Sequence, residues 1–264
     1  MKLKLTIAAA LTAALALPGQ AQDLSYVPGT FAYHLNTELH QKQEAMGQTN
    51  EVHRTAAQYI TLTLDRQAGD ALGFAITVDS SKTESSSGPA PEPESKLVGK
   101  TVTGTVSPAG RVLTFSAPVD SATTEAEFRS LRAFFVRLPT GSARGASVVD
   151  TLADTIQTQG LEIKQMVVMT STVAGDTTID GQRAIILERN GTLTMSGDGE
   201  QGGNELLLNG TGTVAGKVYV SAAGGLLGGQ IKNDAQMSVS VPAANMTIPI
   251  TQSSTSTFSR VAAK

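Results

Sequence analysis

The chain contains no cysteine and no tryptophan, and only 4% of its residues are aromatic. Without cysteine, the protein has no disulfide bonds and no thiolate nucleophile, and it cannot carry the acylated cysteine of a bacterial lipoprotein. The scarcity of aromatic rings argues against sugar binding by ring stacking and against the aromatic girdles of an outer-membrane barrel. The last residues, Val261 to Lys264, also lack the terminal aromatic residue that is typical of outer-membrane strands.

The chain also lacks a marked excess of either charge. Its net charge is −3, from 20 lysines and arginines and 23 aspartates and glutamates, and both signs are scattered along the sequence. A nucleic-acid-binding protein typically gathers lysine and arginine into a stripe. We therefore expect no nucleic-acid partner.

The N-terminus has the features of a secretory signal peptide over residues 1–21. Met1 to Lys4 is basic, Leu5 to Leu17 is apolar, and small residues precede the expected cleavage after Ala21. The apolar run is shorter than the roughly 20 residues of a membrane-spanning helix, so a signal peptide is favoured over an anchor. No later segment is apolar over such a length, so we expect no transmembrane segment after cleavage. Export from a bacterium, to the periplasm or beyond, fits an exported chain without cysteine.

Alternation of apolar and polar residues is clearest from Gln230 to Phe258. Side chains of a strand point alternately to its two faces, so this pattern predicts a hairpin with one apolar and one polar face. The turn falls at Pro242 to Asn245. Four polar residues interrupt the apolar parity: Asn233, Gln252, Ser254 and Ser256.

The same pattern predicts further antiparallel strands. Residues 142–160 fit either a helix or an edge strand, and we favour the strand. Leu113 and Phe115 are expected on one face of their strand. A turn is expected from Asp176 to Gly181, because aspartate and glycine are typical turn residues. The other predicted strands are 33–40, 52–64, 72–78, 97–106, 111–119, 161–172, 183–189 and a glycine-punctuated series from 191 to 260.

Two segments depart from the strand pattern. Residues 79–95 contain six serines and three prolines, which predicts a mobile loop, with a lid over a cavity as the alternative. Thr124 to Glu127 has the pattern of a capping box, and apolar residues at helical spacing follow it. The sequence therefore predicts one helix over 124–136.

Together these elements predict a mainly β protein, built from antiparallel meander or half-barrel sheets with one helix. The sequence Thr-Gly-Thr-Val occurs at 103–106 and again at 211–214, each time followed by a glycine, a basic residue and a valine. Duplication of a β unit and chance similarity are both open explanations. We expect a first β unit over 22–138, with the mobile loop and the helix, and a second over 139–264 packed with the first.

Three short motifs, together with the signal peptide and the two β series, carry a resemblance. They are Gly110-Arg-Val112, Phe134 to Pro139 and Asp180-Gly181. In this pattern the chain resembles a family of uncharacterised exported bacterial proteins. That family is similar in outline to the curved half-barrels of lipoprotein carriers, in which an antiparallel sheet wraps a helix and shelters an acyl chain. Many relatives are expected to carry a lipid-anchor cysteine, which this chain lacks.

All three histidines lie in the first predicted hairpin. With a two-residue turn at Met46-Gly47, His40 lies directly opposite His53, and such opposed side chains have Cβ atoms about 5 Å apart. Glu38 lies on the same face. His40, His53 and Glu38 are therefore a candidate zinc or copper site. We favour the alternative interpretation, in which these are ordinary polar residues on the solvent face of a hairpin.

The other polar or glycine-rich clusters are more typical of turns than of ligand-binding or catalytic sites. Asp198, Glu200 and Asn204-Glu205 lack the acid spacing of a calcium loop, and Gly224 to Gly229 lacks the strand and helix that flank a phosphate loop. No Gly-x-Ser-x-Gly sequence occurs. We predict no catalytic residues and no cofactor, and we do not expect an enzyme.

Two functions stay open. In the first, the concave face of a bent sheet shelters a hydrophobic or lipid ligand. In the second, the same apolar residues form the closed core of a structural or interaction protein of the envelope, which is the default for an apolar strand face. The expected partner is accordingly a hydrophobic ligand or an envelope component. The predicted ligand-lining residues are Phe74, Ile76, Phe115, Met237, Val239 and Ile248.

Cleavage after Ala21 yields a mature protein that begins at Gln22. Intact-mass spectrometry of the protein exported by a bacterium should give the mass of residues 22–264. The substitution Ala21→Arg should block cleavage, because signal peptidases require a small residue at that position. Retention of residues 1–21 on the native exported protein would contradict the signal-peptide interpretation.

Overall fold

The structure is a computed structural model, which describes residues 23–45, 47–86, 97–116, 131–132, 134–158 and 160–262. These residues form one antiparallel sheet of eleven strands, which confirms the predicted fold class. A 3₁₀ turn, η1 (Pro242–Ala244), joins the last two strands. The strands are β1 (Gly29–Ala45), β2 (Gln48–Arg66), β3 (Leu72–Ser85), β4 (Thr101–Val106), β5 (Val112–Ser116), β6 (Ser147–Thr158), β7 (Leu161–Ile179), β8 (Gln182–Gln201), β9 (Asn204–Ser221), β10 (Leu226–Val241) and β11 (Met246–Val261).

The strand order across the sheet is β5-β4-β3-β2-β1-β11-β10-β9-β8-β7-β6. Neighbouring strands are consecutive in the chain everywhere except at β1 and β11. Two meanders, β1 to β5 and β6 to β11, are therefore joined into a single sheet by the pairing of the first strand with the last. The short β5 and the longer β6 are the outermost strands in this order.

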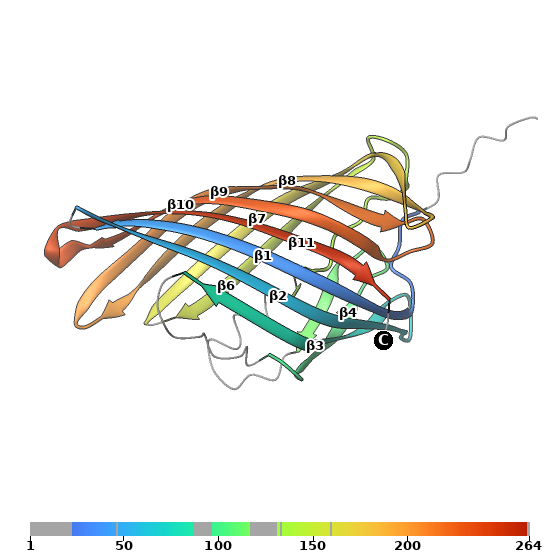
Figure 1. Cartoon of the computed structure of the whole chain (residues 1–264), viewed down its shortest axis with the longest axis horizontal. Coiled ribbons are helices and arrows are strands. Elements are labelled where there is room, and N and C mark those ends of the chain that lie inside the picture. Colours follow the sequence, from blue (N-terminus) through green and yellow to red (C-terminus); the bar gives the residue numbers. More distant parts are fainter. Residues whose placement is uncertain are drawn as a thin grey trace, which may run out of the picture.

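The sheet bends over on itself (Figure 1). Buried side chains of β2, β3 and β4 belong to the same apolar cluster as buried side chains of β7, β8 and β9. The two meanders thus face each other, with the blue strands β1 and β2 in Figure 1 opposite the yellow strands β7 and β8. We call the side that carries this cluster the concave face.

Bulges and glycines allow the bend. The register shifts between Tyr59 and Ile60 and between Val173 and Gly175, and a bulge of this kind bends its strand. On the concave face, a Cβ on Gly216 would collide with the carbonyl oxygen of Gln230 on the next strand. Glycine at such a position lets the backbones approach on the inner side of a curved sheet.

The core fills one end of the concave side. The ring of Phe135 lies 4.7 Å from that of Phe74, and residues 134–138 pack between the two walls of the sheet. The Tyr26 hydroxyl donates to the carbonyl oxygen of Val136 at 3.3 Å and accepts from its amide at 2.9 Å. These two hydrogen bonds satisfy buried backbone groups in an irregular segment, which holds that segment against the core.

The register confirms several local predictions. Leu62 lies opposite Ile76 in the β2–β3 hairpin, and Val239 lies opposite Ile248 in the β10–β11 hairpin. The ambiguous segment 142–160 contains the outer strand β6. Within the turn predicted from Asp176 to Gly181, only Asp180 and Gly181 turn, with φ angles of 48° and 76°, and Asp176 lies inside β7. Two positive φ angles in sequence match a two-residue hairpin loop.

Other local predictions differ from the structure. β3 continues to Ser85, so the first part of the expected mobile loop is strand, because it pairs with β2. Leu113 is 51% exposed, because it is the extra residue where the β4–β5 register shifts, while Phe115 packs on the core. The first Thr-Gly-Thr-Val copy ends β4 before a turn, whereas the second continues straight through β9, so the two copies are not structurally equivalent.

Three expectations fall wholly or partly outside the described residues. The signal peptide over 1–21 and residues 87–95 of the expected loop lie outside them. Of the helix expected over 124–136, Leu131 and Arg132 are helical, residues 134–136 are not, and the others lie outside. In the described part of the chain, no helix is both long and apolar enough to cross a bilayer.

The substitution Gly216→Ala should lower the free energy of unfolding by roughly 1–3 kcal/mol, because the added methyl group overpacks the inner side of the bend. Gly73→Ala is the control, since the three atoms nearest to a Cβ there all belong to the flexible side chain of Gln67. Urea unfolding followed by circular dichroism measures both. Equal unfolding free energies for the two variants would contradict the role of Gly216 in the curvature.

Candidate functional site

The concave face carries three zones in succession along the strands: the core, a belt of polar side chains, and a second apolar patch. Consecutive strands place a row of belt positions side by side, in an order that the pairing fixes. From β7 through β11 to β1, this row is Ser171, Arg189, Gly216, Ile231, Ser256 and Thr37. The polar residues that interrupt the apolar parity of β10 and β11 belong to this belt.

Most belt side chains are hydrogen-bonded to one another. The hydroxyls of Thr37 and Ser256 lie 3.0 Å apart across the β1–β11 pair. The Asn233 amide donates to the Ser254 hydroxyl at 3.3 Å across the β10–β11 pair. Partly buried hydroxyls and amides that satisfy each other in this way stabilise a polar strip beside an apolar core.

Arg189 is the exceptional member of the belt. Its side chain lies on the concave face of β8 and is only 7% exposed. Its Nε donates to the Ser171 hydroxyl at 3.3 Å. None of the ion pairs between described residues involves Arg189. Within the described part of the chain, this buried guanidinium thus has one neutral hydrogen-bond partner, whereas buried charges in proteins are usually paired.

Burial has the largest effect on the pKa of Arg189. It lowers the pKa of the Arg189 guanidinium, while the nearby Tyr26 hydroxyl and Asp150 carboxylate act in the opposite direction. Arginine remains protonated in proteins in spite of such shifts, so the site keeps a positive charge. Burial raises the pKa of the Tyr26 hydroxyl, which keeps that neighbour neutral.

A second apolar surface begins beyond the belt. We call it the distal apolar patch. Four of its members are buried without belonging to the core cluster: Leu206, Leu208, Ala235 and Val241. The other members are partly exposed. The patch consists of concave-face residues of β7 to β11: Ile163, Val167, Leu193, Met195, Leu206, Leu208, Ala235, Met237, Val239, Val241, Met246, Ile248 and Ile250.

The structure divides the six predicted ligand-lining residues between two of these zones. Phe74 and Ile76 are buried in the core, and Phe115 packs against it with its ring 6.2 Å from that of Phe74. The other three residues lie in the distal apolar patch, where Met237 faces Ile250 and Val239 faces Ile248 across β10 and β11. The six residues share one face of the sheet but do not meet in one place.

Sequence reasoning missed Arg189. A signal was present, because Arg189 falls on the apolar parity of β8, between Leu187 on one side and Gly191 and Leu193 on the other. A single charged residue in such a position indicates either a buried charge or a site. Only the bend of the sheet shows that it is buried.

The convex face carries shallow open depressions. One of about 460 Å³ is lined mainly by polar residues, among them His40, Thr213 and Asp234. Another, of about 690 Å³, includes Glu188 and Lys217, whose side chains form an ion pair at 3.5 Å. Both hollows are open to solvent, whereas a typical small-molecule pocket encloses most of its ligand.

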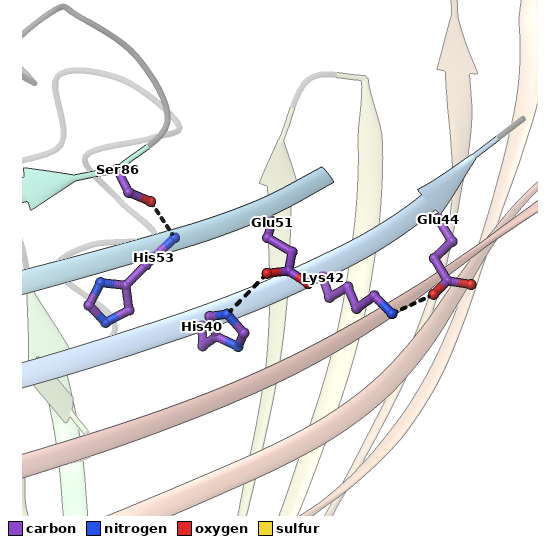
Figure 2. A network of polar contacts seen from close by, with 6 residues as sticks. All are labelled: His40, Lys42, Glu44, Glu51, His53 and Ser86. Carbon is purple, nitrogen blue, oxygen red and sulfur yellow. Dashed lines mark hydrogen bonds and ion pairs between the residues drawn. The ribbon is translucent and has the colours of Figure 1, made fainter. Parts of the chain in front are cut away.

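The histidine pair lies on the convex face of the first hairpin (Figure 2). His40 is directly opposite His53, as the two-residue turn predicts, and their ring centroids are 6.3 Å apart. The His40 Nε2 atom lies 4.0 Å from the Glu51 carboxylate, and Glu38 pairs in register with Thr55. Within the described residues, no group of three histidine, aspartate or glutamate side chains is arranged to hold a metal ion.

The two glycine-rich segments form hairpin turns, as expected. Asp198 and Glu200 lie near the end of β8, and Gly202-Gly203 makes the turn into β9 at Asn204. Gly224 and Gly225 have positive φ angles between β9 and β10. The geometry of both segments is explained by chain reversal.

No family model matches the chain, and no curated protein matches it. An OmpF structure from Salmonella typhi, in complex with daunomycin, is 11% identical with a TM-score of 0.29, over 89% of this chain and 98% of that one. A mutant Rh. blastica porin is 9% identical with a TM-score of 0.27, over 88% and 100%. A DUF1329 family protein from Desulfovibrio piger is 10% identical with a TM-score of 0.20, over 86% and 83%.

These likenesses are too remote to show a family or a function. The resemblance to lipoprotein carriers gains no support from the comparisons.

A zinc titration tests the histidine pair. We expect the double variant His40→Ala/His53→Ala to bind zinc no differently from the native protein, because two exposed imidazoles without a third ligand do not complete a tetrahedral site. Isothermal calorimetry at neutral pH measures the affinity. A one-to-one site in the native protein that disappears in the double variant would establish the metal site instead.

Proposed function

We propose that this chain is an exported, non-enzymatic protein of the bacterial envelope that shelters a hydrophobic or lipid ligand on the concave face of its sheet. The observation that carries the proposal is the distal apolar patch. Its side chains line the inner side of a bend, on the face that elsewhere forms the core. A concave apolar surface with a few polar groups at its border is the usual form of a small-molecule site.

The dimensions of the patch suit an extended apolar chain. Along β8, the six residue-to-residue steps from Leu193 to Gly199 cover roughly 20 Å at the usual rise of a strand. Four strand spacings, from β7 to β11, give a similar width. Gly197, Gly199, Gly210 and Gly212 lie among the apolar side chains and add no side-chain bulk of their own.

The alternative function is a structural or interaction protein of the envelope that takes no small ligand. The extensive buried core around Tyr33, Ile60 and Leu187 fits either function. The partly exposed distal patch favours ligand binding, because an apolar face that serves only stability gains by being fully buried.

The substitution Met237→Glu tests the proposal. It places a charge in the centre of the patch, so the affinity for N-phenyl-1-naphthylamine, a neutral apolar probe, should fall by at least about tenfold. The matched control is Gln236→Glu, which adds the same charge at the neighbouring exposed position on the convex face. Probe fluorescence measures binding, and circular dichroism checks that both variants are folded.

Two results would contradict ligand binding. One is the absence of probe binding by the native protein, and the other is an equal loss of binding in both variants. Native mass spectrometry of protein purified from bacterial membranes adds an independent measurement. The bare polypeptide mass in repeated preparations would favour the structural alternative.

A further inference from the structure

We propose that the ligand is an anionic amphiphile, with its acidic headgroup paired to Arg189 and its apolar chain extended over the distal apolar patch. This inference rests on the proposed function and specifies its ligand class. It follows from the position and the burial of one side chain, and from the absence of a counter-ion for it among the residues that the structure describes.

The position of Arg189 is the first step. The residue lies in the polar belt, at the border between the core and the distal apolar patch. Farther along the same face of β8 come Gly191, Leu193 and Met195. A molecule whose head lies at Arg189 can therefore extend its tail along this strand into the patch without crossing another charged side chain of β8.

The charge balance is the second step. Burying a cation without a partner costs several kcal/mol, even after the protein relaxes. Among the described residues, the guanidinium makes one hydrogen bond, from Nε to Ser171, which uses one of its five N–H donors. A carboxylate accepts two parallel hydrogen bonds from arginine, so a fatty-acid headgroup matches both the missing charge and the free donors.

The surroundings are the third step. Gly216 lies directly beside Arg189 on β9 and contributes no side chain, and the space over it is filled by the side chain of Ile231 on β10, which is uncharged. Ser171 lies beside it on β7. The Ser171 hydroxyl can donate to a bound carboxylate while it accepts from Nε.

Asp150 is the competing partner. It is an acid of β6 close enough to raise the pKa of the Arg189 guanidinium, although the two side chains form no ion pair. Its negative charge opposes an incoming anion. The ligand-site and internal-pair interpretations therefore predict opposite effects of removing it.

Competition between two ligands of equal chain length tests the headgroup. Dodecanoate and dodecan-1-ol are each expected to displace N-phenyl-1-naphthylamine from the native protein, and the ratio of their affinities measures the preference for a carboxylate. We expect Arg189→Met to lower this ratio by at least about tenfold. The control is Arg183→Met, which removes an exposed arginine of the same strand, ion-paired to Asp176 at 3.1 Å, and leaves the ratio unchanged.

Two further variants keep the test decisive if Arg189→Met does not fold. Arg189→Lys retains the charge but loses the two-pronged geometry, so it should keep only part of the preference. Asp150→Asn removes the competing charge and should raise the ratio severalfold. A fall of the ratio in Asp150→Asn would show that Asp150 supports the site, and would overturn the proposed role of Arg189 as the carrier of the unpaired charge.

The two proposals fail in different ways. If the probe binds and both ligands displace it, but the ratio is the same in native protein, Arg189→Met and Arg189→Lys, the headgroup assignment is wrong and the apolar site stands. If neither the probe nor either ligand binds the native protein, the proposed function fails and the inference falls with it.

Discussion

The pairing of β1 with β11 is the interaction on which the rest of the structure depends. It joins Ala32 to Val261 at one end and Gln43 to Ile250 at the other, and so connects the two extremes of the folded chain. Without it there would be two separate meanders, each with an apolar face to cover. With it there is one sheet, long enough to bend over and to cover its own apolar face. Contacts between residues so distant in sequence are costly to form, because a long loop must close first.

The bend has an unequal effect along the strands. At one end, Phe135 and its neighbours fill the space between the two walls, and the core is complete. At the other end, the same face continues as a partly exposed apolar patch. The polar belt marks the border between the two. Packing apolar side chains against polar groups such as the hydroxyls of Thr37 and Ser256 would cost free energy, because it removes these groups from water.

Arg189 is the point where stability and the proposed function oppose each other. Among the described residues the buried guanidinium has one neutral partner, Ser171, and burying a charge in this way costs stability, so a hydrophobic residue at that position is expected to be neutral or stabilising. Natural proteins depart from such local rules mainly at functional sites. On the convex face, by contrast, ion pairs such as Arg183 with Asp176 are exposed and contribute little to stability.

The sequence by itself determined most of the strands and turns, and the face on which most strand side chains lie, although Leu113 and the end of β3 departed from it. The alternation around Met237 and Val239, the turn at Asp180-Gly181 and the pairing of His40 with His53 were all predictable, because each depends on a local period or on a short turn. The tertiary structure decided which meander lies beside which, that Phe74 and Met237 occupy different zones, and that Arg189 is buried. These features depend on backbone pairing between distant strands and on the curvature of the whole sheet, and no local pattern of side chains specifies either one.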